Sequence, residues 1–158
     1  MKKLSAWMLG AVLSLVLCGG ISAQEEIFFT PDSIPWGPGP ASLPPGAQMA
    51  VLEGAPAKPG PFTIRLKFPP HYNVQPHWHP APEHVTVLSG ALSLAMGDVF
   101  DTTKEKKVLS AGGFRVMPAT AHHFGWTTTE ETIIQLHGVG PWEINYLNSS
   151  DDPRQSKK

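Results

Sequence analysis

Residues 76–90 read PHWHPAPEHVTVLSG and place three histidines and one glutamate in a segment that otherwise has the composition of a β-strand. His77 and His79 are two residues apart, so on an extended chain both side chains leave the same face. Glu83 lies four residues further on with the same parity, and the intervening PAP can bend the chain so that the three groups converge. Two imidazoles and a carboxylate suit a divalent first-row transition metal, so this stretch predicts a metal site.

A fourth ligand has to come from a facing strand, and the stretch HHFGW supplies two adjacent histidines, His122 and His123. Neighbouring residues of a strand point to opposite faces, so one of these imidazoles faces the metal and the other faces away. Parity alone leaves open which of the two is the ligand.

The chain after residue 46 has the pattern of many short strands. The clearest is PFTIRLKF, which alternates apolar and polar residues strictly, and each expected strand is bounded by Gly, Pro or a charged turn such as TTKEKK. No window of a dozen residues in the mature chain shows a helical period. Strands at intervals of roughly ten residues predict an all-β sandwich or small barrel. The expected strands lie within residues 61–68, 83–90, 90–97, 113–118, 131–138 and 142–148.

The histidine-rich stretch resembles the first motif of the cupins, G-x5-H-x-H-x3,4-E-x6-G. The match runs through His77, His79, Glu83 and Gly90. At the leading glycine position this chain has His71 instead.

The second cupin motif, G-x5-P-x-G-x2-H-x3-N, is matched by Gly112, Pro118 and His123. Thr120 stands in place of the motif's glycine, and Thr127 stands in place of its asparagine. These departures leave the ligand set whole but affect the turn that precedes His123.

The resemblance implies a fold and a ligand set. It implies a cupin-type double-stranded β-helix, or jelly-roll barrel, over about residues 47–148. It also implies that a divalent transition metal (Mn, Fe, Zn, Ni, Co or Cu) is bound by one carboxylate and three imidazoles, with His122 pointing away. The implied ligands are His77, His79, Glu83 and His123.

Residues 1–23 have the pattern of a secretory signal peptide. The segment MKKLSAWMLGAVLSLVLCGGISA begins with two lysines, continues with an apolar run and ends in small residues before Gln24. The apolar run is too short to span a bilayer comfortably, which favours a cleaved leader over the alternative, a retained membrane anchor. The pattern therefore predicts an exported protein, periplasmic or secreted, that is cleaved near Ala23.

Cleavage would leave a mildly acidic chain without cysteine. Of the twelve Lys and Arg residues, Lys2 and Lys3 leave with the signal peptide, whereas all thirteen Asp and Glu residues remain. This balance provides no basic face for nucleic acid and no polybasic membrane patch, so we expect neither nucleic-acid binding nor stable membrane insertion after cleavage. The single cysteine, Cys18, is also removed, so stability must come from a packed core and from the metal.

Residues 24–46 are rich in Pro and Gly and predict an extended N-terminal arm. The arm either docks on the barrel through Phe28, Phe29 and Trp36 or forms a flexible leader. The polar tail, residues 149–158, is expected to fray. Exposed sheet edges need covering, and cupins often pair through their sheets and arms, so the resemblance implies a homodimer.

Three further residues are candidates for lining a pocket beside the metal. Gln135 and His137 share one strand face, which points either inward or outward by parity alone, and Arg65 either orients an anionic substrate or lies on a solvated face. Val85 and Val87 have the same parity as Glu83 and are expected to form apolar walls.

Two classes of function compete. In the first, the protein is a metal-dependent enzyme, dioxygenase-like or isomerase-like, that acts on a small oxygenated compound, as the resemblance implies. In the second, it is a metal-dependent module that binds or senses a small molecule without converting it. No residue outside the ligand set reads as a general acid or base, and a fold alone does not decide between the two.

Overall fold

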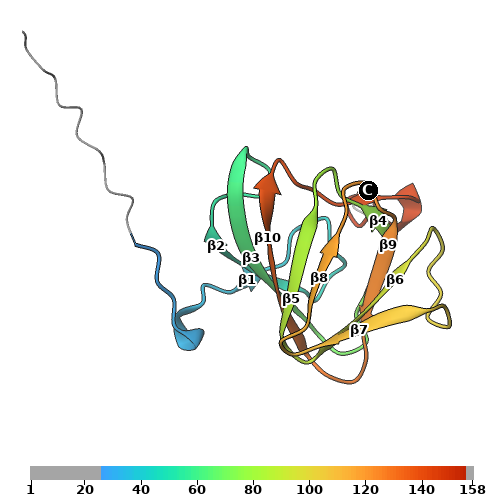
Figure 1. Cartoon of the computed structure of the whole chain (residues 1–158), viewed down its shortest axis with the longest axis horizontal. Coiled ribbons are helices and arrows are strands. Elements are labelled where there is room, and N and C mark those ends of the chain that lie inside the picture. The colour runs from blue at the N-terminus through green and yellow to red at the C-terminus, as the bar shows by residue number, and fades with distance from the viewer. Residues whose placement is uncertain (1–25, 156–158) are drawn as a thin grey trace, which may run out of the picture.

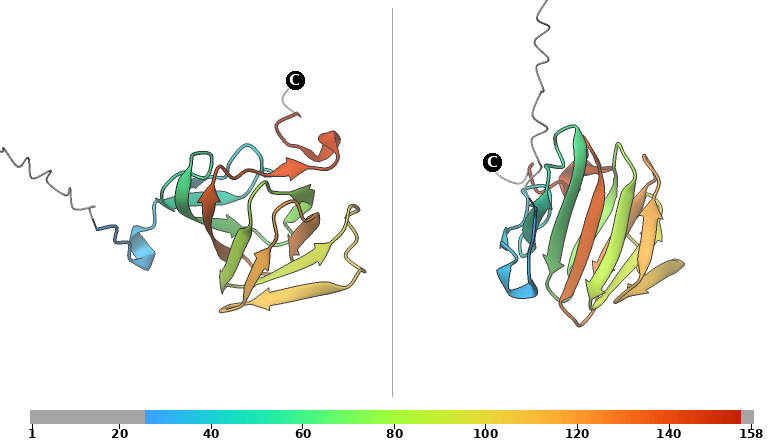
Figure 2. Two further views of the ribbon diagram at one scale, coloured as in Figure 1. Left: turned by 45° about the horizontal axis from the view of Figure 1, so that its top comes forward. Right: turned by 60° about the vertical axis from the view of Figure 1, so that its left-hand side comes forward.

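In the computed structural model, which describes residues 26–155, the chain forms two antiparallel β-sheets that pack face to face (Figures 1 and 2). This confirms the all-β, jelly-roll prediction. The expected signal peptide lies outside the described residues, as does the end of the polar tail. Within residues 26–155 no helix has the length and apolarity needed to cross a membrane.

Each sheet contains strands that are distant in sequence. The first sheet has the order β1 (Gly37–Pro38), β2 (Gln48–Glu53), β3 (Gly60–Phe68), β10 (Thr132–Gly140), β5 (Glu83–Ser89) and β8 (Phe114–Met117). The second has the order β11 (Asn145–Tyr146), β4 (Asn73–Trp78), β9 (His123–Thr127), β6 (Ala91–Met96) and β7 (Lys106–Ser110). Two short 3-10 helices, Pro31–Ser33 and Ser149–Asp151, flank the strands.

The alternating strands bury one face each, as the sequence predicts. In β3 every second residue is buried, beginning at Phe62, and in β5 Val85 and Val87 are buried with Glu83. Side chains from both sheets meet between the layers and exclude water, which is the main stabilising contribution to such a sandwich. The core contains Phe62, Ile64, Leu66, Phe68, Val85, Val87, Leu92, Leu94, Ile134 and Leu136, among others.

The strand β9 is buried on both faces, which removes any alternation from its sequence. All five residues of HFGWT are buried. On the outer face of the second sheet Phe124 and Trp126 form a small separate cluster with Ala95, and Phe100 packs against it from the β6–β7 connection. Such a strand carries no period-two signal, so the sequence pattern places HHFGW on a facing strand without showing which of its faces is buried.

The strand β4 contains a β-bulge that brings a histidine to the inner face. The pairing register between β4 and β9 shifts between Val74 and His77, with Pro76 inside the irregular segment. Val74 and His77 are therefore both buried although they are three residues apart. Proline lacks an N–H for the ladder and is tolerated at bulges, and bulges commonly redirect a side chain next to a site.

The predicted N-terminal arm docks from Ile34 onward, where Ile34 is buried and Lys67 Nζ lies 4.5 Å from the centre of the Trp36 ring. Gly37–Pro38 pairs with β2, and the Tyr146 hydroxyl donates to the Ser42 carbonyl at 2.7 Å. The Tyr72 hydroxyl donates to a second carbonyl of the arm, that of Pro44. By contrast Phe28 is 75% exposed, and the segment around it lies away from the sheets (Figure 1).

Two residues at the glycine positions of the cupin motifs adopt left-handed backbone conformations. His71 has a φ of 58° and Thr120 has a φ of 62°. The Thr120 N–H donates to the carbonyl of His79 at 2.8 Å, so the turn before β9 retains its shape without the glycine. This conformation costs a β-branched residue roughly 1–2 kcal/mol relative to glycine.

We therefore expect Thr120→Gly to stabilise the protein. The relief of strain exceeds the entropy that glycine loses on folding, so the free energy of unfolding should rise by about 0.5–1 kcal/mol. Ala119→Gly is the matched control, because Ala119 has a negative φ. This variant should lose about 0.5–1 kcal/mol in the free energy of unfolding. Urea unfolding measures the free energy of unfolding of both variants. Equal losses in the two variants would show that the backbone of Thr120 is not strained.

Candidate metal centre

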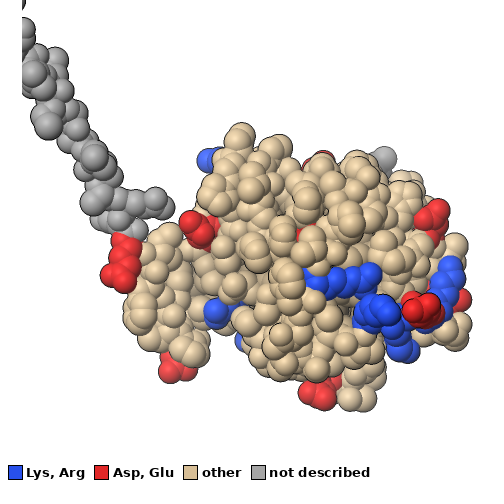
Figure 3. Space-filling view, in the orientation of Figure 1, with Lys and Arg blue, Asp and Glu red and all other residues tan. Residues whose placement is uncertain are grey.

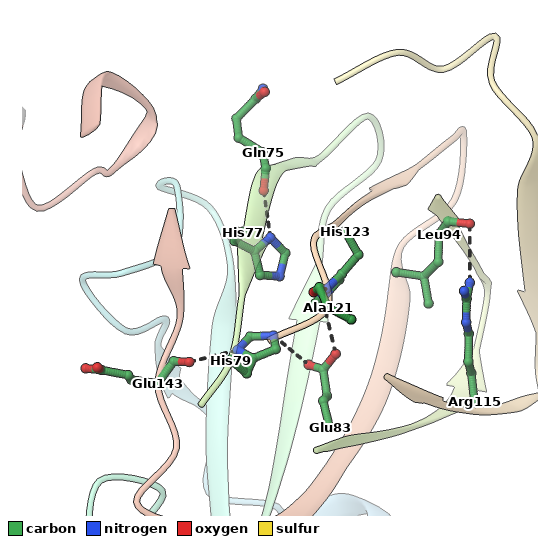
Figure 4. Close-up of polar contacts among 9 residues, drawn as sticks. All are labelled: Gln75, His77, His79, Glu83, Leu94, Arg115, Ala121, His123 and Glu143. Atoms are coloured by element: carbon green, nitrogen blue, oxygen red, sulfur yellow. Dashed lines mark hydrogen bonds and ion pairs between the residues drawn. The ribbon is translucent and has the colours of Figure 1, made fainter. Parts of the chain in front are cut away.

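Three buried imidazoles converge between the two sheets. His77 comes from β4, His79 follows the end of that strand, and His123 begins β9. One ring nitrogen from each lies within 4.8 Å of the others, and the three residues are only 1–5% exposed (Figure 4). The triad is positioned for metal binding.

Backbone carbonyls hold all three imidazoles by their Nδ1 atoms. His77 Nδ1 lies 2.6 Å from the Gln75 carbonyl. His79 Nδ1 lies 2.8 Å from the carbonyl of Glu143, and His123 Nδ1 lies 2.9 Å from that of Ala121. A carbonyl can only accept, so each Nδ1 carries the proton and each Nε2 presents a lone pair. Carbonyls that orient histidines in this way are typical of the second shell of metal sites.

The Nε2 atoms of His79 and His123 are buried and have no hydrogen-bond partner. Burying an unpaired polar atom normally costs about 1–3 kcal/mol, so orphaned atoms of this kind call for a partner. A divalent cation that accepts both lone pairs would supply it. The donor set and the orphaned atoms therefore fit a transition metal.

Glu83 faces this triad from the opposite sheet. It is the first residue of β5, and its two carboxylate oxygens each approach one imidazole (Figure 4). Oε1 lies 3.6 Å from His79 Nε2, and Oε2 lies 3.6 Å from His123 Nε2. These separations exceed a hydrogen-bond length, so the carboxylate lies near the imidazoles without satisfying them.

The environment keeps His77 and His79 neutral and Glu83 ionised. Burial, with smaller contributions from the neighbouring histidines, lowers the pKa of His77 to about 3, and burial also lowers the pKa of His79. Burial raises the pKa of Glu83, but His79 and His123 together outweigh it and lower this pKa to about 2. A metal ligand must be in these protonation states, so little proton competition opposes metal binding near neutral pH.

We expect the metal-free protein to lose stability on acidification below pH 6.5. Below that value the unfolded chain protonates His77, whereas the folded chain does not until the pH approaches about 3. The loss for this group is about 1.4 kcal/mol per pH unit within that window. Urea unfolding between pH 7 and pH 4 measures it, with His77→Gln as a control whose slope should be shallower. Equal slopes in the two proteins would contradict a buried neutral His77.

A cavity of about 80 Å³ opens beside the four side chains. Its walls are apolar and come from both sheets, and Val85 of β5 is part of them, as its parity predicts. Trp142 also lines the cavity and stacks on His79 with a centroid separation of 4.2 Å. The arm contributes Pro40, Ser42 and Leu43. The sequence does not predict that these arm residues line the cavity, because a Pro/Gly-rich segment has no periodicity that shows what it contacts.

The three predicted pocket residues do not line this cavity, and this interpretation is corrected. Arg65, Gln135 and His137 lie on the outer face of the first sheet, because Leu66, Ile134 and Leu136 on the same strands point inward. The Arg65 Nε donates to Gln135 Oε1 at 3.1 Å. His137 stacks on His84 of the neighbouring strand, 4.7 Å between centroids. These three side chains therefore point outward, which is one of the two directions that strand parity left open.

The structure also distinguishes His123, the first residue of β9, from His122, which directly precedes that strand. His123 faces the inner cavity, whereas the His122 side chain is 43% exposed. The His122 Nδ1 lies 2.8 Å from an oxygen of Asp98, on the outside of the second sheet. His122 therefore takes no part in the buried cluster.

Comparison with known proteins agrees with this geometry. Residues 24–143 match the family described as the ChrR Cupin-like domain. No match was found among curated proteins.

Several solved structures share the fold. A putative acetylacetone dioxygenase from Methylibium petroleiphilum has a TM-score of 0.63 and 20% identity, covering 84% of this chain and 88% of that chain. The polyketide cyclase RemF from Streptomyces resistomycificus has a TM-score of 0.55 and 17% identity, with coverages of 69% and 76%. KdgF from Halomonas sp. has a TM-score of 0.54 and 18% identity, with coverages of 80% and 98%. At such identities the similarity shows the fold alone.

Proposed function

The chain belongs to the ChrR cupin-like family, and from this premise we propose that it is an exported metal-dependent enzyme acting on a small oxygenated compound. The proposed ligands of its divalent transition metal are one carboxylate and three imidazoles. They are His77, His79, Glu83 and His123. Within this class we favour oxidoreductase chemistry of the dioxygenase type over isomerisation.

One observation carries the proposal. Two Nε2 lone pairs are buried without partners next to an ionised carboxylate, at the end of an apolar cavity. A structural metal site is normally closed by its ligands, whereas a catalytic one has room beside it. Here the cavity leaves room for a small substrate next to the ligand set.

The bound metal would supply Lewis acidity or, if it is redox-active, electron transfer to dioxygen. The protein's own residues do the rest. Backbone carbonyls hold His77, His79 and His123 in the tautomer that presents Nε2. Trp142 fixes the plane of His79 by stacking, and the apolar walls exclude bulk water from the cavity.

The composition of the cavity favours a second candidate, a non-catalytic module that binds or senses a small molecule. Among the described lining residues, no titratable side chain other than the four proposed ligands is present. The wall therefore offers no separate general acid or base. A reaction in this cavity would have to use the metal and the substrate's own protons.

Metal content and turnover measured on one preparation test the proposal. Elemental analysis of the purified protein should show about one transition-metal ion per chain. The same sample is then offered a panel of enols, diketones and sugar acids, with dioxygen consumption and product formation recorded. Turnover supports the enzyme. Tight binding without turnover by any metal form would establish the second candidate.

Export and cleavage are part of the proposal and rest on the sequence pattern of residues 1–23. Mass spectrometry of the protein recovered from the exported fraction should find an N-terminus at or near Gln24. An intact Met1 in that fraction would contradict it.

We further propose a homodimer that forms through the outer face of the first sheet. Phe114, Val116 and Val139 lie on this face and are 43–64% exposed. Charged side chains are sparse over β10 and β5 and gather instead near β7 (Figure 3). An apolar face of this kind is typical of an association surface. Light scattering at micromolar concentration should give twice the chain mass, and Phe114→Lys should lower it to that of one chain.

A further inference from the structure

The cavity beside the proposed metal site has no side chain that can neutralise a second negative charge. Among the described residues that line it there is no lysine or arginine, and the only titratable side chains are the four proposed ligands. Most of the wall consists of aliphatic side chains, including Ile64, Leu92 and Ile134. A charge buried against such walls is costly unless a counter-charge lies next to it.

The charge of the ligand set then limits the charge of the occupant. Coordination requires neutral imidazoles and an ionised carboxylate, so a divalent ion with Glu83 and three histidines has a net charge of +1. A ligand with one negative charge at the metal makes the buried complex neutral. A dianion leaves an excess negative charge, and the walls offer nothing to balance it.

The cavity also offers few hydrogen-bonding groups. Apart from the proposed metal ligands, Ser42 and Trp142 are the lining residues whose side chains can form a hydrogen bond. A sugar derivative with several hydroxyl groups would leave most of them unpaired, at about 1–3 kcal/mol each. The volume of about 80 Å³ further restricts the occupant to a small molecule.

We infer that the substrate is a small compound with a single negative charge, carried by the oxygen atoms that meet the metal, and with an otherwise apolar body. Enolisable 1,3-diketones belong to this class, because they lose one proton on chelation. Dicarboxylates, phosphate esters and polyhydroxylated sugar acids lie outside it. The inference rests on the proposed metal site and narrows the substrate class of that same site.

Two ligands of equal size isolate the effect of charge. In pentane-2,4-dione two methyl groups occupy the places that two carboxylate oxygens occupy in malonate, so both have seven non-hydrogen atoms and both chelate through two oxygens, the dione as a monoanion and malonate as a dianion. Binding is measured by calorimetry on the zinc-loaded protein, because zinc has no redox chemistry and binding is then observed without oxidation. We expect the dione to bind at least about tenfold more tightly than malonate. Equal binding, or tighter binding of malonate, would overturn the inference.

A pair of lysine variants tests whether the charge of the wall is the cause. Ser42→Lys places a cation on the cavity wall, whereas Ala41→Lys places the same charge on an exposed neighbour that does not line the cavity. Ser42→Lys should reduce the preference for the dione about tenfold or reverse it, and Ala41→Lys should leave it unchanged. If both variants changed the preference for the dione equally, the charge of the cavity wall would not be its cause.

Zinc content, determined before each titration, distinguishes failure of the metal site from failure of the substrate class. A protein that takes up no zinc contradicts the proposed metal site. A protein that holds one zinc ion per chain and binds neither ligand, or prefers malonate, contradicts the substrate class while the metal site stands.

Discussion

A His123→Ala variant is expected to purify without metal, whereas His122→Ala should retain the metal content of the unaltered protein. The two residues are adjacent, with His122 directly before β9 and His123 at its start, yet their environments are opposite. His123 is 1% exposed and presents an unpartnered Nε2 to the cluster, whereas His122 lies on the outer face beside Asp98. The pair is a matched control, because both variants remove one imidazole from adjacent positions of the chain.

Loss of the metal should also lower stability, because a metal that binds only the folded chain adds RT ln(1 + [M]/Kd) to the free energy of unfolding. At a free metal concentration one thousand times the Kd this amounts to about 4 kcal/mol. Adding metal should therefore raise the melting temperature of the unaltered protein and of His122→Ala by several degrees. It should not change that of His123→Ala. His77→Ala and His79→Ala are expected to behave like His123→Ala.

Glu83→Gln is a milder change at the same site. It keeps the size of the side chain but removes the negative charge that lies 3.6 Å from two imidazoles. Metal affinity should fall by a factor of ten or more, because an amide oxygen is a weaker ligand than a carboxylate. Full metal content in all four single variants, measured by elemental analysis after dialysis, would show that the metal binds elsewhere.

The sequence predicts this site well where strands alternate and less well where they do not. In β5 a strict period of two places Glu83, Val85 and Val87 on one face, and all three are buried together as expected. For β9 a second apolar cluster buries the outer face as well, so parity cannot show whether His122 or His123 points inward. The pairing of β9 with β4, a long-range interaction, determines which of the two histidines points inward.

The convergence of His77 and His79 also depends on more than their spacing. A bulge at Pro76 turns His77 inward, and His79 lies beyond the end of β4. His79 is then held by Glu143, a contact across 64 residues of chain. Spacing suggested that the two imidazoles share a face, and these irregular features bring them together.

The parts of the cavity that the sequence does not predict come from long-range packing. Ser42 belongs to a segment without periodicity, and it is held at the cavity by the hydroxyl of Tyr146, 104 residues away. Gln135 and His137 share one strand face, and parity gives that face without giving its direction. The apolar residues that alternate with them, Ile134 and Leu136, determine this direction because they fill the core.

Exchanging the metal should separate redox chemistry from Lewis-acid chemistry. We expect the iron-loaded protein to consume dioxygen with a substrate of the class inferred above, and the zinc-loaded protein to lose at least about a thousandfold in rate. Zinc and iron both accept imidazole and carboxylate ligands, so both should occupy the same four side chains. Zinc has no accessible second oxidation state, so the loss would follow from redox chemistry alone.

The comparison requires that the two forms differ only in the ion. Equal metal content, a similar rise in melting temperature and the loss of both effects in His79→Ala establish that iron and zinc use the same site. Under those conditions, substrate binding by the zinc form without turnover supports the dioxygenase-type function, since the cavity and its walls are unchanged. Equal turnover by the two forms would instead assign the protein to the isomerase-like alternative, in which the ion polarises the substrate without changing its oxidation state.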